Sequence, residues 1–114
     1  MSKLDLLQEI IKTYQKYGWK LYSLLLTEDL KHEVKQLQLS NGFLHNALIK
    51  NSVINAIWFT RPSGNRNAWE LRLISASPYA LFETIAADCP VSERERICQA
   101  MEKRLENHAA RFQV

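Results

Sequence analysis

The sequence predicts one α+β domain, in which an antiparallel sheet of three or four strands has the N-terminal and C-terminal helices packed on one of its faces. Three observations favour this class. A hairpin pattern occupies the middle of the chain, and helical patterns with an apolar face stand at both ends. The length of 114 residues suits a single domain, and it is enough to bury a core without disulfides.

Residues 3–17 are expected to form the first helix. Apolar residues recur there at three- and four-residue steps, which is the spacing of one helical face. Ser2 followed three residues later by Asp5 is typical of a helix N-terminus, because the serine side chain can accept from a backbone N–H of the first turn. Gly18 suits the left-handed backbone conformation that ends such a helix.

A buried strand and a short helix follow. The run WKLYSLLL at 19–26 is apolar and partly alternating, and its last three residues offer no polar face, which favours a buried strand. Thr27 is suited to cap a helix through residues 27–37, whose first turn contains Glu28 and Asp29. Negative charge is favourable there because the helix dipole places partial positive charge at the N-terminus.

The central hairpin is the clearest element. VINAIWFTR at 53–61 and AWELRLIS at 68–75 are strand patterns, and PSGNRN between them contains turn residues. A turn centred between Gly64 and Asn65 sets Trp58 opposite Leu71, Thr60 opposite Trp69, Phe59 opposite Glu70 and Ile57 opposite Arg72. The expected core face then holds Ile54, Ala56, Trp58, Thr60, Trp69, Leu71 and Leu73, and the other face is mixed in character. A slip of one residue would exchange the faces of one strand.

Residues 78–87 leave two conformations open. Ser-Pro at 77–78 is typical of a helix start, whereas Leu81, Glu83 and Ile85 alternate as in a strand. The strand is preferred because it completes the sheet.

Composition and charge exclude some classes of protein. The chain is 46% hydrophobic and 24% charged, with a net charge of +3, so disorder is not expected. Residues 61–77 are the most basic segment, with three arginines and one glutamate. Cys89 and Cys98 form no C-x-x-C pair, no leader pattern starts the chain, and the most apolar run, at 21–26, is too short for a membrane span. These features favour a reduced, cytoplasmic protein without a membrane segment.

Residues 37–48, LQLSNGFLHNAL, carry a partial resemblance to a known class. LQLS at 37–40, followed by Leu44 and Leu48, resembles the L-G-L-S-x-x-x-V-x-x-x-L pattern of winged helix-turn-helix DNA-binding domains. The order of elements over residues 3–75 also fits that class. The resemblance implies a winged helix with an extra C-terminal helix, and a recognition helix in the major groove. It further implies base and phosphate contacts by Asn41, His45, Asn46 and Lys50, with Arg61 and Arg66 on the wing.

The same stretch has a second interpretation, as a connection between a short helix and the hairpin. Gly42 would cost the recognition helix about 1 kcal/mol relative to alanine. Lys50 is the one fixed positive charge that this helix would present, although phosphate neutralisation supplies most of the non-specific affinity for DNA. Asn41-Gly42 is also a strong signal for a two-residue turn. We therefore prefer the connection, with the DNA-binding regulator as the alternative.

The hairpin offers a second basis for nucleic-acid binding. Arg61, Arg66 and Arg72 with Trp58, Phe59 and Trp69 would suit a single strand, whose bases stack on aromatic rings. The core needs the rings of Trp58 and Trp69, however, so nucleic acid is not the favoured partner.

The sequence gives little support to catalysis. The three histidines show no metal-ligand spacing, and no cofactor motif is present. Asn55 on one strand and Glu70-Leu71-Arg72 on the next faintly resemble the D…E-x-K arrangement of restriction-endonuclease-like nucleases. A divalent ion needs more carboxylate oxygen than Glu70 alone provides. A nuclease-like fold with weak or no activity is therefore the third interpretation.

The last helix is the best candidate for an interaction surface. It is expected from Ser92, which opens a capping box, to about Ala110. Alternating three- and four-residue steps, the spacing of a coiled-coil seam, connect Cys98, Met101, Leu105, His108 and Phe112. The same residues would alternatively pack on the domain's own core. We therefore expect a non-catalytic binding or adaptor module that acts through protein-protein contact, with another protein or as a homodimer.

Overall fold

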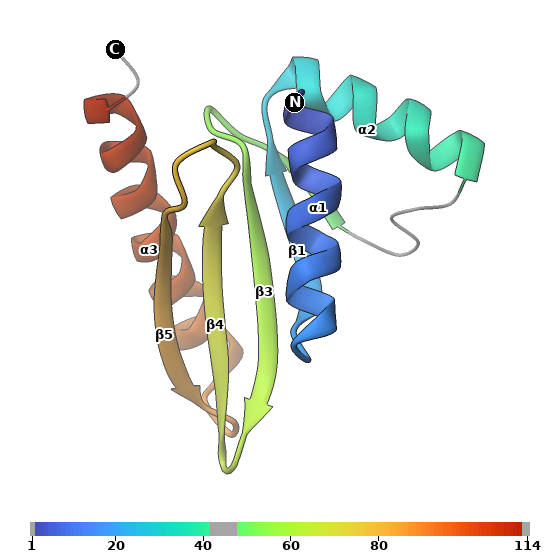
Figure 1. Ribbon diagram of the computed structural model, residues 1–114. Coiled ribbons are helices and arrows are strands. Elements are labelled where there is room, and N and C mark those ends of the chain that lie inside the picture. Colours follow the sequence, from blue (N-terminus) through green and yellow to red (C-terminus); the bar gives the residue numbers. More distant parts are fainter. Residues whose placement is uncertain (1, 42–47, 113–114) are drawn as a thin grey trace.

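The computed structural model describes residues 2–41 and 48–112, which form a five-stranded sheet with helices on both faces (Figure 1). The predicted α+β class is confirmed, but the sheet has more strands than expected. In chain order the elements are α1 (Lys3–Lys16), β1 (Lys20–Leu26), α2 (Glu28–Asn41), β2 (Leu48–Asn51), β3 (Ala56–Ser63), β4 (Arg66–Leu73), β5 (Ala80–Ala86) and α3 (Val91–Phe112).

The sheet is mixed rather than antiparallel. Its strand order is β2-β1-β3-β4-β5, and all neighbours are antiparallel except β1 and β2, which run parallel. Parallel neighbours require a crossover, and α2 stands in that connection. The sequence did not indicate β2 because LIKN at 48–51 is only four residues long, too short to show a period.

The hairpin has the predicted register. Trp58 is opposite Leu71, Thr60 is opposite Trp69, and Ser63 meets Arg66 at the turn. Gly64 adopts a φ of 67°, a left-handed conformation that glycine takes without steric penalty. Residues 80–86 form β5 along the far side of β4, so the preference for a strand over a helix is confirmed.

The ends of α1 follow the local signals, whereas the start of α3 does not. The Ser2 side chain accepts from the Asp5 N–H at 3.1 Å, and Gly18 has a φ of 90°. In α3 the predicted capping by Ser92 is wrong. The carbonyl of Pro90 accepts from the Arg94 N–H at 3.0 Å, so the helix already begins at Val91.

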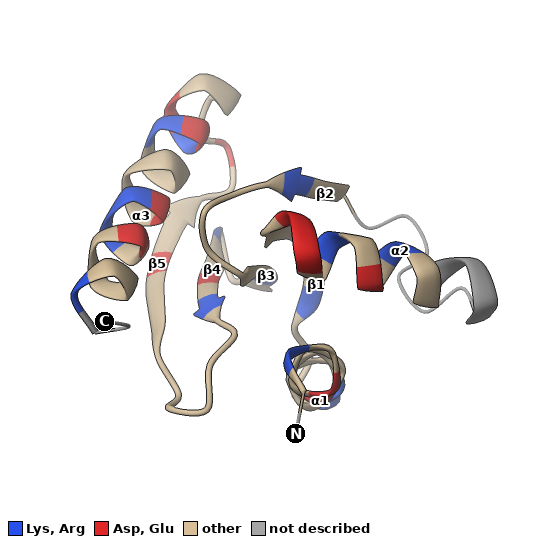
Figure 2. Ribbon diagram, turned by 90° about the horizontal axis from the view of Figure 1, so that it is seen from above, with Lys and Arg blue, Asp and Glu red and all other residues tan. Residues whose placement is uncertain are grey.

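The prediction that the first and last helices share one face is also wrong. Leu7 and Ile11 of α1 pack with Ile57 and Phe59, which were expected on the mixed face of the hairpin. α3 packs on the opposite face, and Figure 2 shows α1 and α3 on opposite sides of the sheet. The physical reason lies in the central strands, which are apolar on both sides, so each face needs its own cover. We call the two sides the α1 face and the α3 face.

The charged residues of α3 are mixed in sign. Acidic and basic residues alternate along α3 in Figure 2, so its outer surface has no field of a single sign. None of the helices formed by residues 2–41 and 48–112 is both long and apolar enough to cross a membrane.

Candidate functional site

The recognition helix predicted between Asn41 and Lys50 is not formed at its C-terminal end. α2 continues through LQLS at 37–40, where the winged-helix resemblance implies a turn, and it ends at Asn41, while Lys50 lies in β2, opposite Leu25 of β1. His45 and Asn46 lie outside the described residues. A helix cannot extend over 48–50 while these residues pair as a strand, so the winged-helix arrangement is incorrect for this part of the chain.

The helical seam predicted as an interaction surface lies mostly inside the protein. Met101 and Leu105 are buried against the sheet, Cys98 is partly buried beside them, and His108 stacks on Tyr79 with the ring centroids 3.5 Å apart. Phe112 is the last residue of α3. The core interpretation is therefore correct for Met101 and Leu105, because side chains that fill the chain's own core cannot also contact a partner.

The nuclease-like residues are not brought together. Glu70 pairs with Phe59, whereas Asn55 precedes the residue that pairs with Leu73, which places them about four residues, or roughly 13 Å, apart along the strands. The Asn55 side chain accepts from Thr27, both from its N–H at 2.8 Å and from its hydroxyl at 3.1 Å. The described residues contain no group of three or more His, Cys, Asp or Glu placed to hold a metal ion.

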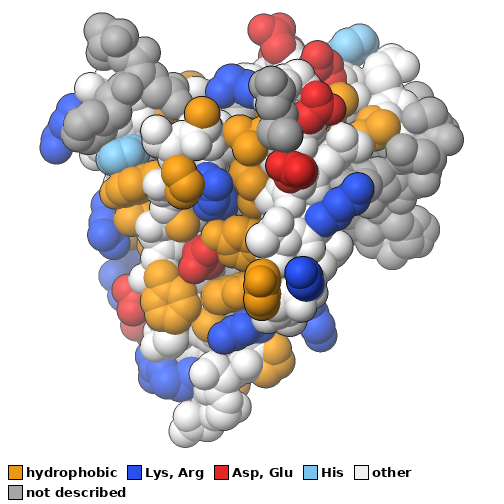
Figure 3. Space-filling model, in the orientation of Figure 1, with side chains coloured by type: hydrophobic (Ala, Val, Ile, Leu, Met, Phe, Trp, Pro, Cys, Tyr) orange, Lys and Arg blue, Asp and Glu red, His pale blue; other side chains and the backbone are white. Residues whose placement is uncertain are grey.

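The structure instead presents two candidate sites, and the first is on the α1 face. α1 and α2 cover β1 and β3 there, but no helix of the described chain covers β4 and β5 (Figure 1). Figure 3 shows hydrophobic side chains gathered over this region, with Lys and Arg around them. We call this surface the open patch; it consists of Tyr17, Trp19, Arg61, Arg66, Arg72 and Phe82.

The aromatic residues of the open patch form a chain of contacts. Phe82 is 56% exposed and meets Trp19 edge-on, with the ring centroids 6.4 Å apart. The Arg61 guanidinium lies 4.8 Å from the Trp19 ring centroid and donates to the carbonyl of Tyr17 at 3.0 Å. Arg61 thus combines a cation–π contact with a backbone hydrogen bond, which holds its charge over the patch.

Tyr14 closes the inner side of the open patch beneath α1. Its ring stacks on Phe59 with centroids 4.0 Å apart, and its hydroxyl donates to the Glu70 carboxylate. Burial raises the pKa of Tyr14 far above its ordinary value, and the hydrogen bond and negative charge of Glu70 raise it further. The Glu70 carboxylate is therefore already engaged by a protein donor.

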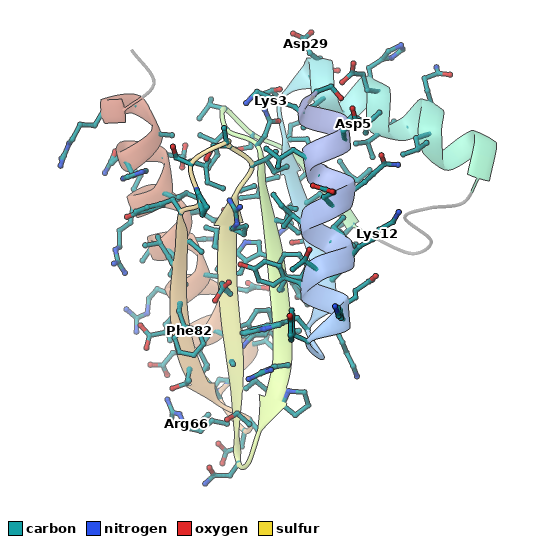
Figure 4. The ribbon with its side chains drawn as sticks, in the orientation of Figure 1. Lys3, Asp5, Lys12, Asp29, Arg66 and Phe82 are labelled. Carbon is teal, nitrogen blue, oxygen red and sulfur yellow. The ribbon has the colours of Figure 1, made fainter. Side chains whose placement is uncertain are left out.

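The arginines of the open patch are held by neutral oxygens. Arg66 donates to the Thr84 hydroxyl at 3.0 Å and to the Thr84 carbonyl at 2.7 Å, and Arg72 donates to the carbonyl of Leu73. Figure 4 shows Arg66 and Phe82 on the uncovered part of the sheet, whereas Lys12 of α1 points away from it. The predicted wing residues Arg61 and Arg66 thus share one surface, and Lys50 lies elsewhere.

The second site is a pocket of about 300 Å³ on the α3 face, between the first half of α3 and the sheet. We call it the α3 pocket. Its lining residues include Ser23, Lys50, Trp58, Trp69, Arg94 and Glu102. The Trp58 indole N–H donates to the Glu102 carboxylate at 2.9 Å. The Ser23 hydroxyl and the Trp69 indole nitrogen are buried and have no hydrogen-bond partner within the described chain.

Cys98 also lines the α3 pocket, where burial disfavours the thiolate form of its side chain. Burial raises the pKa of the Cys98 thiol, and Glu102 adds to the rise, while Arg94 and Lys50 oppose it. A thiol with a raised pKa is mostly protonated near neutral pH, and the thiolate is the reactive form.

Several residues of both sites were missed by the sequence analysis. Trp19 and Tyr22 were assigned only to a buried strand, and Phe82 only to a possible fourth strand. The one available signal was the aromatic content of residues 19–26, which core packing explains equally well.

Comparison of the chain with models of protein families, with curated proteins and with solved structures found no match in any of the three.

Proposed function

We propose that the protein is a non-catalytic binding module that captures an extended, acidic segment of a partner protein at the open patch and the edge of β5. The exposed Phe82 beside Trp19, surrounded by arginines whose hydrogen bonds go to neutral oxygens, is the observation that carries this proposal. Aromatic residues and arginines are the side chains most enriched among energetically dominant contacts in protein interfaces.

The charge of the open patch specifies the chemistry of the partner. Arg61, Arg66 and Arg72 contribute three positive charges, against the one negative charge of Glu70, which accepts from Tyr14. Carboxylates of a partner would form charge-assisted hydrogen bonds with the guanidinium groups, which are stronger than neutral ones. An acidic segment is therefore complementary to this surface, and a basic one is not.

The β5 edge supports an extended conformation for that segment. In the described chain β5 pairs only with β4, so its outer backbone groups, apart from the Thr84 carbonyl that accepts from Arg66, are available for strand addition. A second copy of this chain is a poorer occupant. Two β5 strands paired antiparallel about their midpoint would place Glu83 opposite Glu83, and directly opposed like charges are destabilising.

The test is a binding titration with two synthetic peptides, followed by backbone amide NMR shifts. One peptide alternates glutamate and valine, and the control alternates lysine and valine. We expect the acidic peptide alone to shift the β5 amides, with affinity that falls as salt rises. Phe82→Ala and Arg61→Ala should each weaken binding about tenfold, whereas Val53→Ala, which truncates another exposed residue, should not.

Three outcomes would overturn this proposal. Equal binding of both peptides, or no binding of either, would remove the charge argument. A molecular mass that doubles with concentration, and that Phe82→Ala restores to the monomer, would replace the partner with a second copy. Tighter binding of an oligothymidylate than of the acidic peptide at the same amides would indicate single-stranded nucleic acid, for which aromatic and basic surfaces are also suited.

A further inference from the structure

We infer that the α3 pocket binds a small aromatic carboxylate, whose oxygens accept from the Ser23 hydroxyl and the Trp69 indole N–H. This site lies on the face of the sheet opposite the open patch and does not depend on the proposed peptide binding. Both groups belong to nearly or fully buried residues, at 0% exposure for Ser23 and 4% for Trp69, and both residues line the same pocket.

The two tryptophans of the pocket differ in whether the indole N–H has an acceptor. Trp58 and Trp69 meet edge-on with centroids 6.1 Å apart, and each is almost completely buried. The indole of Trp58 has an acceptor in Glu102, whereas the indole of Trp69 has none in the described chain. Buried polar groups are nearly always hydrogen-bonded, so the unpaired indole N–H of a pocket residue points to an acceptor that the described chain does not supply. Because both unpaired atoms are closed to solvent in this structure, that acceptor reaches them only when neighbouring side chains of the pocket shift.

An irregularity in β1 brings Ser23 to this position. The pairing of β1 with β3 shifts between Leu21 and Ser23, so Tyr22 has no partner in the ladder. Tyr22 reaches the same face as Ser23 and meets Trp69 edge-on at 4.8 Å. Bulges of this kind re-aim side chains and are frequent beside binding sites.

The aromatic walls of the pocket indicate the shape of the ligand body. Tyr22, Trp58 and Trp69 provide aromatic surfaces that suit a flat apolar body. Lys50 and Arg94 supply two positive charges, and the Arg94 guanidinium lies 5.7 Å from the Trp69 ring centroid. Glu95 and Glu102 also line the pocket, and Glu102 accepts from Trp58, so the formal charges of the lining cancel and the two unpaired polar groups, rather than net charge, favour a carboxylate.

A carboxylate fits this arrangement better than other small polar groups. It is an acceptor without donors, so its two oxygens can accept from Ser23 and Trp69 together. An amine in the same place would leave the Trp69 donor unpaired. The volume of the pocket, about 300 Å³, corresponds to a small ligand of one or two rings.

The experiment uses benzoate as the probe, with benzamide and benzylamine as comparators, on the full ¹⁵N-labelled chain. The sequence has three tryptophans, so three indole N–H signals are expected, and Trp→Phe variants assign them. We expect benzoate to shift the Trp69 indole signal downfield with a dissociation constant of about 1 mM or tighter, and to leave the Trp19 signal unchanged. Benzamide should bind more weakly, and benzylamine should not bind.

Variants separate the hydrogen bonds from the charge. Ser23→Ala and Trp69→Phe should each weaken benzoate binding at least about tenfold, measured on the Gln99 backbone amide, whereas Trp19→Phe should not. Lys50→Gln should weaken benzoate but not benzamide, with Lys12→Gln as the matched control. Each variant is first compared with the wild type by its amide shift dispersion, and a second substitution, Ser23→Cys, replaces Ser23→Ala if that variant does not fold.

Several results would overturn the assignment. An unmoved Trp69 signal at saturating benzoate would show that the ligand binds elsewhere. Equal affinity for benzylamine would contradict an acceptor role, and undiminished binding by both Ser23→Ala and Trp69→Phe would remove the two donors from the site. No binding of benzoate or benzamide would remove an aromatic carboxylate as the ligand.

Discussion

The two faces of the sheet solve the same packing problem in different ways. On the α1 face, α1 and α2 cover β1, β2 and β3 but leave β4 and β5 uncovered, and the polar groups near the uncovered strands are paired, as in the Tyr14 to Glu70 hydrogen bond. On the α3 face, one long helix covers β4 and β5 too, yet two buried polar atoms of the described residues have no partner. An exposed surface whose polar groups are already hydrogen-bonded suits a large partner, whereas an enclosed pocket with unpaired polar groups suits a small ligand.

The largest expected effect tests whether α3 packs on the chain's own core or forms an interface with another chain. Leu105→Ala should lower the free energy of unfolding by about 2–5 kcal/mol, because Leu105 is fully buried in the α3-face core. Leu7→Ala, its counterpart on the α1 face, should lower the free energy of unfolding by a similar amount. Both values are measured by urea denaturation. Val91→Ala is the control, since Val91 is 55% exposed. A variant Leu105→Ala that changed only the oligomeric mass would make α3 an intermolecular surface instead.

A smaller effect tests the hydrogen bond between Tyr14 and Glu70 on the α1 face. The folded-state pKa of Tyr14 is raised, so the phenol stabilises the fold below its unfolded pKa, about 10, and this contribution is lost as pH rises further. The stability of the wild type should therefore fall above pH 10, with Tyr14 adding at most about 1.4 kcal/mol per pH unit. Tyr14→Phe should flatten that slope.

The control for this slope is Glu70→Gln, which keeps an acceptor for the Tyr14 hydroxyl but removes the negative charge. Its slope should lie between those of the wild type and Tyr14→Phe. Identical slopes for all three proteins in denaturant titrations between pH 9 and pH 12 would show that Tyr14 is not the group that titrates.

The smallest effect tests the unsatisfied groups of the α3 face. In the absence of ligand, Ser23→Ala should leave the free energy of unfolding unchanged or raise it by up to about 1 kcal/mol, because it removes a buried hydroxyl that lacks a partner. Thr60→Val should instead lower stability by about 1 kcal/mol, since the Thr60 hydroxyl donates to the carbonyl of Ala68 at 3.0 Å. If both variants were destabilised equally, Ser23 would have a hydrogen-bond partner in the folded protein.

Some features of the candidate sites were within reach of the sequence. Arg61 and Arg66 were identified as surface residues near the turn, and they do lie together on the open patch. The aromatic residues beside them were misjudged, because Trp58 and Trp69 were the rings considered and both are in the core. The rings that the patch uses, Trp19 and Phe82, come from segments 63 residues apart, and no local pattern connects them.

The sequence by itself determined the local structure: the N-terminus of α1 at Ser2, the left-handed glycines at 18 and 64, and the register of the hairpin. These features depend on backbone preferences and on the two-residue period of strands, which act over a few residues. The tertiary structure alone decided that α1 and α3 take opposite faces, that β2 pairs parallel to β1, and that Ser23 and Trp69 share a pocket. Those outcomes depend on covering both apolar faces of the central strands, a requirement that arises only when the strands are side by side.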